Sequence, residues 1–226
     1  MSRTLLIAAL ALAEAGGGAA VPRASGVGLC GSKQGEDLPF KKPVTLGTSP
    51  GPMRARIREL RHLGVAVSFI DARSEGRGEV PVVPVPEGDL REVLPKLLKL
   101  SEGYECSITA GRLVVSPHSS KHRQVVTGPD LPTLPRIQAV WRYTEWLNAN
   151  IPAFALFGSQ AIQGYPFASL YADKVQLTRT RSVVEHLVEL LGSDPTLVFT
   201  VDKSCPDSTC EGDRVVFDRI PGGAPR

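Results

Sequence analysis

Two pairs of residues have spacings that suit a metal site. His118 and His122 are separated by three residues. Cys205 and Cys210 are separated by four. Together these side chains offer the four nitrogen and sulfur ligands of a tetrahedral Zn²⁺ site. The histidines, however, stand in a polar stretch beside Lys121, where solvated histidines are the commoner outcome. We therefore expect no bound metal and no cofactor, and keep as an alternative a metal-binding or thiol-redox protein that uses Cys205 and Cys210.

Other motifs of catalysis are incomplete. The triplet at Ser159 has a glycine before it but lacks the second glycine of a nucleophile elbow. The stretch around Lys33 has the residue types of a phosphate-binding loop in the wrong order. His186 lies in an apolar helical stripe, and no acid or nucleophile is placed beside it by spacing, so we expect it in the core with a hydrogen-bond partner. The sequence predicts no catalytic residues and no enzyme.

The four cysteines indicate how the chain is stabilised if it is exported. Cys205 and Cys210 are close enough in sequence to close a small loop, and we expect a disulfide between them. A bridge between Cys30 and Cys106 is geometrically open but not required by the sequence. A buried free Cys106 is an equal alternative.

The N-terminus resembles a secretory signal. Arg3 precedes a short apolar stretch over residues 4–13, and small residues follow at the positions that a signal peptidase reads. We expect a signal peptide over residues 1–20, a flexible segment over 21–42, and a periplasmic or secreted protein. A start placed too far upstream is the alternative. Beyond the first twenty residues no apolar run is long enough to span a membrane.

Composition and charge exclude some partners. Of the 226 residues, 42% are apolar and 22% charged, which is an ordinary globular balance. The net charge is only +3, with basic and acidic residues interspersed, so we expect no nucleic-acid partner. One local feature is basic: Arg54, Arg56, Arg58 and Arg61 give the first predicted helix a basic outer face. Such a face is usually solvated, and phosphate or lipid-headgroup binding is the alternative.

The same order of elements occurs twice. Each copy reads strand, helix, strand, strand, helix, strand, strand, over residues 43–117 and 124–221, with a linker at 118–123. An offset of 93 residues takes Tyr104 to Leu197 and Ile108 to Val201, and the second hairpin then lengthens by nine residues. Asp89 and Ser182 stand where each second helix begins, and Pro95 should bend the first of these helices or delay its start. We predict an α+β fold of two tandem domains, each a mixed sheet with two helices on one face.

The copies resemble the short N-terminal (STN) domain shared by secretins and TonB-dependent signalling receptors. The resemblance rests on residues 85–98, which contain a helix with paired leucines, on the aromatic strand that begins at Tyr104, and on the glycine turn and apolar strand of residues 111–117. It covers residues 43–117 well and 124–221 more loosely. It implies an extracytoplasmic, non-enzymatic module that docks other proteins through exposed strand edges and helix faces.

Aromatic residues of one helix suggest where a partner could bind. Trp141 fits the stripe that the helix should bury, whereas Tyr143 and Trp146 fall off it. These two could pack under the loop at Phe167, or form an aromatic docking patch. We predict a protein-protein interaction module of the bacterial cell envelope whose partner is an unknown envelope protein. A structural subunit that self-associates through its sheet edges is the other alternative.

Overall fold

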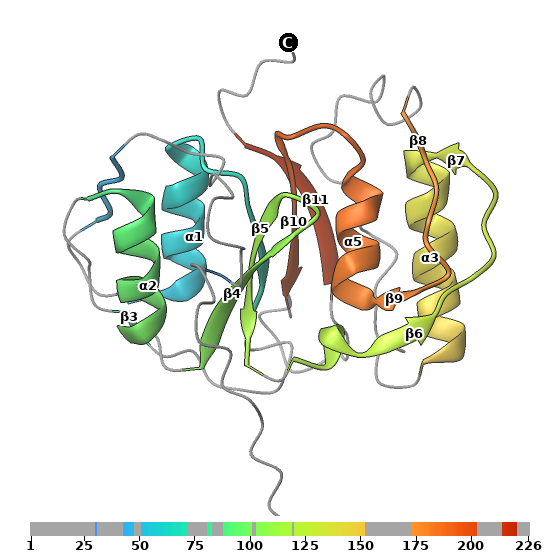
Figure 1. The fold of residues 1–226 in the computed structure, drawn as a ribbon, viewed down its shortest axis with the longest axis horizontal. Helices are drawn as coiled ribbons and strands as arrows, with labels where there is room; N and C mark the ends of the chain where they lie inside the picture. Colours follow the sequence, from blue (N-terminus) through green and yellow to red (C-terminus); the bar gives the residue numbers. More distant parts are fainter. Residues whose placement is uncertain are drawn as a thin grey trace, which may run out of the picture.

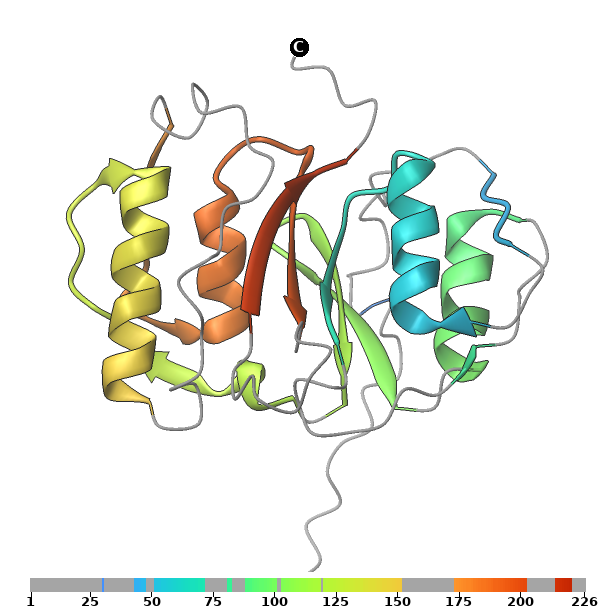
Figure 2. The same cartoon turned by 180° about the vertical axis from the view of Figure 1, so that it is seen from behind.

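The structure is a computed structural model that describes residues 30, 43–47, 51–71, 81–82, 88–100, 103–118, 120–151, 173–202 and 214–220. In this part, four α-helices lie on the two faces of a central sheet. Figures 1 and 2 show α1 (Met53–His62) and α2 (Leu90–Leu100) on one face, and α3 (Arg136–Asn150) and α5 (Val183–Leu191) on the other. The predicted α+β class is confirmed.

The two copies contribute to one sheet. A hairpin of β4 (Tyr104–Thr109) and β5 (Arg112–Pro117) comes from the first copy, and a hairpin of β10 (Leu197–Asp202) and β11 (Arg214–Arg219) from the second. Between them lies β2 (Val67–Ile70), parallel to both neighbours, so that the order is β11-β10-β2-β5-β4. The expectation of a separate sheet in each copy is therefore wrong for the described residues. We call residues 43–117 the first half and residues 124–220 the second half.

Three small pairings surround this sheet. Strand β1 (Gly51–Pro52) pairs with β3 (Pro81–Val82), and β7 (Leu134–Pro135) pairs with β8 (Lys174–Val175). A third pair joins β6 (Val125–Thr127) to β9 (Thr180–Ser182), and its counterpart in the first half is a single bridge between Val44 and Gly88. A short 3-10 helix, η3 (Lys121–Arg123), lies between the halves in the chain. All three pairings are antiparallel.

The pairings of the two halves correspond residue by residue. In the first hairpin Ser107 lies opposite Val114, and in the second Thr200 lies opposite Val216. The offset of 93 residues takes Ser107 to Thr200, as the sequence comparison predicts. The same offset takes Pro81 and Val82, which pair with β1, to Lys174 and Val175, which pair with β7. The hairpins are thus equivalent in register although they lie at different places in the sheet.

The helix ends follow the predicted signals. Ser182 caps α5 through a capping box with Glu185, and the Asp89 side chain accepts from the Arg91 N–H at 2.7 Å at the start of α2. Helix α2 starts at Leu90 and continues through Pro95, so the predicted delay of its start is wrong. At the end of α1, Gly64 has a φ of 90°, a left-handed conformation that glycine adopts without strain.

Two apolar cores lie on opposite faces of the sheet. The core under α1 and α2 is built from the first half and Cys30, with Phe69 and Val115 on its sheet side. The core under α3 and α5 also contains Ile70 and Val114, which belong to the first half. Successive side chains of a strand point to opposite faces, so β2 and β5 serve both cores at once. The second half therefore completes its core with residues that it does not itself supply.

A disulfide joins Cys30 to Cys106 of β4, with their Cα atoms 4.5 Å apart. Of the two states of Cys106 that the sequence left open, the structure has the bridged one. Such a bridge is typical of an oxidising compartment. The predicted Cys205–Cys210 bridge, the signal peptide over 1–20, and the motifs at Lys33 and Ser159 lie outside the described residues.

Candidate functional site

The histidines of the candidate zinc site have different surroundings. The side chain of His118 is 56% exposed, and its Nδ1 lies 3.1 Å from a carboxylate oxygen of Glu105. His122 is buried, with Nδ1 3.1 Å from the hydroxyl of Ser120. Cys205 and Cys210 lie outside the described residues, and within the part of the chain that is described no group of three His, Cys, Asp or Glu residues could hold a metal. The structure therefore supplies no support for the zinc alternative.

His186 lies in the core, and both ring nitrogens have partners, as predicted. Its Nε2 is 2.7 Å from the Thr178 carbonyl, which can only accept, so Nε2 carries the proton. Nδ1 then accepts from the Tyr143 hydroxyl at 2.9 Å. Burial, with the negative charge of Glu189 as a second cause, raises the pKa of Tyr143 well above its usual value. This pair joins α3 to α5 and is closed to solvent, so it is a structural contact.

Of the two alternatives for Tyr143 and Trp146, the aromatic docking patch is wrong for Tyr143, and the loop at Phe167 lies outside the described residues. Tyr143 is fully buried against His186, and Trp146 is partly buried and stacks on Tyr143 with ring centroids 6.1 Å apart. Trp141, expected in the core, is 57% exposed instead. Helix α3 buries a stripe centred on Ala139, Tyr143 and Leu147, which puts Trp141 on the far side. Tyr143 therefore cannot contact a partner in this structure.

The exposed face of α3 forms a shallow groove around Trp141. The groove has a volume of about 460 Å³ and is lined by Ile137, Gln138, Trp141, Arg142 and Glu145. A large aromatic residue in such a position is a common anchor in protein interfaces. The sequence is compatible with an exposed Trp141, because a buried stripe shifted by one residue along α3 places Tyr143 in the core and Trp141 at the surface.

A second cleft lies between α1 and the adjacent strands β10 and β11. It has a volume of about 400 Å³, and its residues include Arg54, Arg58 and His62 on α1 and Asp202 and Asp218 on the strands. Arg58, His62 and Asp218 are exposed. Arg54 lies 3.7 Å from Asp202. The cleft is therefore polar and carries both signs of charge, with basic groups on its helix side.

The four arginines of α1 do not form a common solvated face. Arg56 is buried, where Nη1 donates to Glu59 at 2.8 Å and to the Gly47 carbonyl at 3.0 Å. Arg61 donates to the Val67 carbonyl and reaches β10, where Nη2 donates to the Phe199 carbonyl at 2.9 Å. Burial is the main cause that lowers the pKa of Arg61 to about 10, so it remains protonated at neutral pH. The predicted basic outer face is thus wrong for Arg56 and Arg61.

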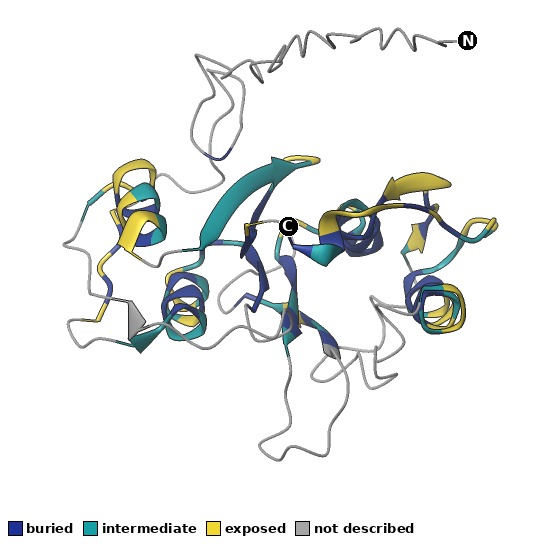
Figure 3. Ribbon diagram, turned by 90° about the horizontal axis from the view of Figure 1, so that it is seen from below, coloured by how far each residue is buried: buried dark blue, intermediate teal, exposed yellow. Residues whose placement is uncertain are grey.

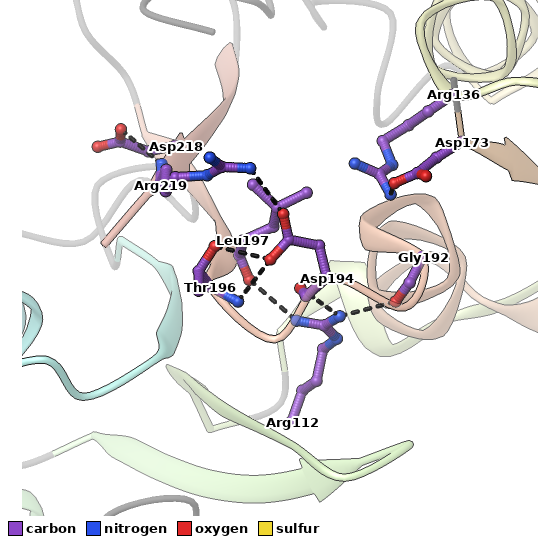
Figure 4. A network of polar contacts seen from close by, with 9 residues as sticks. All are labelled: Arg112, Arg136, Asp173, Gly192, Asp194, Thr196, Leu197, Asp218 and Arg219. Carbon is purple, nitrogen blue, oxygen red and sulfur yellow. Dashed lines mark hydrogen bonds and ion pairs between the residues drawn. The ribbon is translucent and has the colours of Figure 1, made fainter. Parts of the chain in front are cut away.

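Another arginine joins the two halves at the opposite end of β10. Arg112, at the start of β5, donates to the carbonyls of Gly192, Asp194 and Leu197 at 2.7, 2.8 and 3.0 Å (Figure 4). Gly192 and Asp194 follow the C-terminus of α5, and Leu197 is the first residue of β10. Arg61 and Arg112, both from the first half, therefore each donate to a backbone carbonyl of β10.

The outer edges of the sheet are candidate binding surfaces. Strand β4 is the last strand on the first-half side, and within the described residues no strand pairs with its outer edge. Figure 3 shows β4 half-exposed along its whole length, beside inner strands that are mostly buried. Cys30 is bonded to Cys106 in the middle of this strand. An edge strand of a sheet can bind an added strand where its backbone groups are accessible.

Comparison with known proteins gives no relative. No family model matches the chain, and neither a curated protein nor a solved structure does. Among the described residues, no helix has the length and apolar character needed to cross a membrane.

Proposed function

We propose that the protein is a non-enzymatic, extracytoplasmic module of the bacterial cell envelope that binds another protein. The observation that supports this proposal most directly is the outer edge of β4, which lies at the end of a five-stranded sheet. Six consecutive residues of this strand are half-exposed. Strand addition to such an edge uses backbone hydrogen bonds for affinity and alternate side chains for specificity.

Export is the second part of the proposal, and the Cys30–Cys106 disulfide supports it. It is tested by the non-reducing intact mass of the protein recovered from fractionated cells of the source organism. A mature chain in the envelope fraction, shortened near residue 20 and lighter by two hydrogens per bridge, is expected. A full-length chain with free thiols in the cytosol would exclude export.

Docking is tested by photo-crosslinking in the same cells. A photoreactive residue replaces Ser107 of β4, whose side chain points away from the α1 and α2 layer, or Trp141 of α3 as the comparison. We expect a discrete crosslinked partner from position 107, and its loss when Ile108→Pro is added. Capture from position 141 alone would move the docking surface to α3, and no capture from either position would contradict the proposal.

The cleft between α1 and β10–β11 supports a second candidate function, the binding of an anionic ligand. Arg58 and His62 are exposed at its helix side, and the guanidinium and an imidazole N–H are donors that suit a carboxylate or phosphate. Titration with inorganic phosphate, followed by amide shifts in NMR spectra, tests this. Shifts that lie in the cleft and disappear in Arg58→Ala, but not in the control Lys96→Ala on α2, would support it. Shifts spread evenly over basic residues would exclude it.

A further inference from the structure

The charges in the cleft between α1 and the β10–β11 hairpin have a definite order. Arg54, Arg58 and His62 follow one another at intervals of four residues, so they lie along one face of α1 over about 12 Å. Asp202 and Asp218 belong to the two strands of the hairpin and line the same cleft. A row of basic groups on the helix therefore faces acidic groups on the sheet.

The register of the hairpin sets the distance between the two aspartates. Asp218 lies opposite Val198, which precedes Asp202 by four residues in β10. Val198 and Asp202 point to the same face, because side chains alternate along a strand. The two acidic groups are therefore separated by about 13 Å along the sheet. This length matches that of the basic row on α1.

Only one end of the cleft has its charges paired. Arg54 lies 3.7 Å from Asp202. Arg58 and Asp218 are exposed, and neither forms an ion pair with another described residue. The Asp218 carboxylate accepts from the Arg219 backbone N–H at 2.8 Å, which leaves its negative charge uncompensated. A cation and an anion of the cleft therefore remain accessible to a ligand.

The buried guanidinium of Arg61 shows that these two charges act on the same part of the cleft. Its Nη1 donates to the Thr200 hydroxyl at 2.8 Å, and its Nη2 donates to the Phe199 carbonyl. Burial is the main cause that lowers the pKa of Arg61, the negative charge of Asp218 opposes it, and the positive charge of Arg58 adds to it. Both charges are therefore close enough to influence one buried group.

The acidic groups are a feature of the second hairpin and not of the repeat. The offset of 93 residues takes Thr109 to Asp202, and the matching registers of the two hairpins take Ser116 to Asp218. Both counterparts in the first half are neutral, and Ser116 is fully buried. The repeated framework therefore does not require aspartate at either place.

We propose that this cleft binds a zwitterionic short peptide, about two residues long, with its carboxylate at Arg58 and its ammonium group at Asp218. Arg58 is in the middle of the basic row and Asp218 is at the end of the acidic one, so they are about 6 Å apart along the cleft, the span of two extended residues. Apolar side chains of Ile57, Phe69 and Val216 also line the cleft and suit the aliphatic part of such a ligand.

This inference rests on the second candidate function, the binding of an anionic ligand, for which it names the ligand class. A guanidinium offers a carboxylate two parallel N–H donors, and a carboxylate accepts from an ammonium group. Phosphate bound at Arg58 would be repelled by Asp218, and a diamine bound at Asp218 would be repelled by Arg58. A molecule that carries both charges avoids both repulsions.

The test compares three forms of one dipeptide, alanylalanine, on the oxidised full chain. The free form carries both charges, the N-acetylated form only the carboxylate, and the C-terminally amidated form only the ammonium group. Amide shifts in NMR spectra locate the binding site and measure the affinity. We expect the free form to shift the signals of Arg58 and Asp218, and to bind at least about tenfold more tightly than either blocked form.

Two substitutions assign one charge of the ligand to each side chain. Arg58→Gln should remove the advantage of the free form over the amidated form, and Asp218→Asn should remove its advantage over the acetylated form. Lys96→Gln, at an exposed site of α2, is the control and should leave both ratios unchanged. If a variant folds poorly, the three forms of the dipeptide on the unmodified chain still decide the question.

The outcomes separate this inference from the function on which it rests. Equal affinity of the free and acetylated forms, with shifts in the cleft, would overturn the zwitterion and leave anion binding in place. Shifts in the cleft with inorganic phosphate but not with the dipeptide would do the same. Equal affinity of the free and amidated forms would exclude any role of the carboxylate. No shift in the cleft with either the dipeptide or phosphate would overturn both proposals.

Discussion

The two halves of the molecule have matching elements but differ in what completes them. The core of the second half includes Ile70 and Val114 from the first half, and its strand β10 is paired on both sides. The core of the first half receives no side chain from the described strands of the second half, and among the described strands only β5 pairs with its strand β4. A repeated strand can therefore be an inner strand of the sheet in one copy and an edge strand in the other. We therefore expect stability to depend on the core of the second half, and binding on the edge strand of the first half.

The largest effect should come from shortening the side chain that the first half contributes to the other core. We expect Ile70→Ala to lower the free energy of unfolding by about 2–5 kcal/mol, because it leaves a cavity among fully buried residues. Urea unfolding is followed by tryptophan fluorescence, since Trp141 and Trp146 both lie in the second half. Leu63→Ala, at an exposed site of the first half, is the control and should change stability by less than about 0.5 kcal/mol. An unchanged tryptophan transition in Ile70→Ala would mean that the halves are energetically independent.

The disulfide should have the next largest effect, because it ties Cys30 to the edge strand β4 of the first half. Cys30 and Cys106 are 76 residues apart, and a bridge of that span restricts the unfolded chain. We expect the double change Cys30→Ser and Cys106→Ser to cost about 2–4 kcal/mol. Far-ultraviolet circular dichroism and tryptophan fluorescence should report the same midpoint in this variant, because the halves share one sheet. Two separate midpoints would show that the halves unfold one after the other.

Arg112 tests the contact that fastens the second half to the first. We expect Arg112→Met to cost about 1.5–3 kcal/mol, because three carbonyls near the end of α5 lose a charged donor. Denaturant unfolding measures the loss, and hydrogen exchange should quicken in the last turn of α5 before other regions. Arg58→Met is the matched control, because Arg58 is exposed and the change removes no contact to a described residue. Equal effects of the two changes would show that the Arg112 contacts contribute nothing specific.

The sequence predicts the local elements of this fold well. The stripes of α1, α2 and α5, the caps at Asp89 and Ser182 and the register of the two hairpins follow from residues close together in the chain. The shared sheet does not, because the pairing of Phe69 with Thr200 joins residues far apart and no local pattern specifies which half β2 will join. Strand β2 is buried on both faces. Over only four residues its pattern cannot be told from the alternation of a strand that is buried on one face.

The candidate site was less predictable than the fold. The buried stripe predicted for α3 lies one residue away from the observed one. This shift puts Trp141 in the core and Tyr143 outside it, the reverse of what the structure has. Periodicity alone cannot settle such a shift, because aromatic residues with polar groups are stable both in a core and at a surface. The position of β4 at the edge of the sheet is a property of the assembled strands, so it could not be identified before their order was known.

The smallest effect should come from the charge of Glu185 in the capping box of α5. This charge distinguishes the start of α5 from the start of α2. Burial raises the pKa of Glu185, but hydrogen bonds from the backbone and side chain of Ser182 and the positive charge of Arg181 outweigh it and hold the pKa below its usual value. A depressed folded-state pKa stabilises the fold above the unfolded value, about 4.3, and this stabilisation is lost as the pH falls through the folded value.

Glu185→Gln should therefore reduce the loss of stability between neutral pH and about pH 4, with little change in the fold at neutral pH. The free energy of unfolding is measured in urea at several pH values, and Glu145→Gln, on the exposed face of α3, is the control. Because Glu185 is partly exposed, solvent screening keeps the effect well below that of Arg112→Met. If both glutamine variants lose stability with acid as steeply as the unmodified chain, the capping box of α5 has no electrostatic role, and the ends of α5 and α2 differ only in their hydrogen bonds.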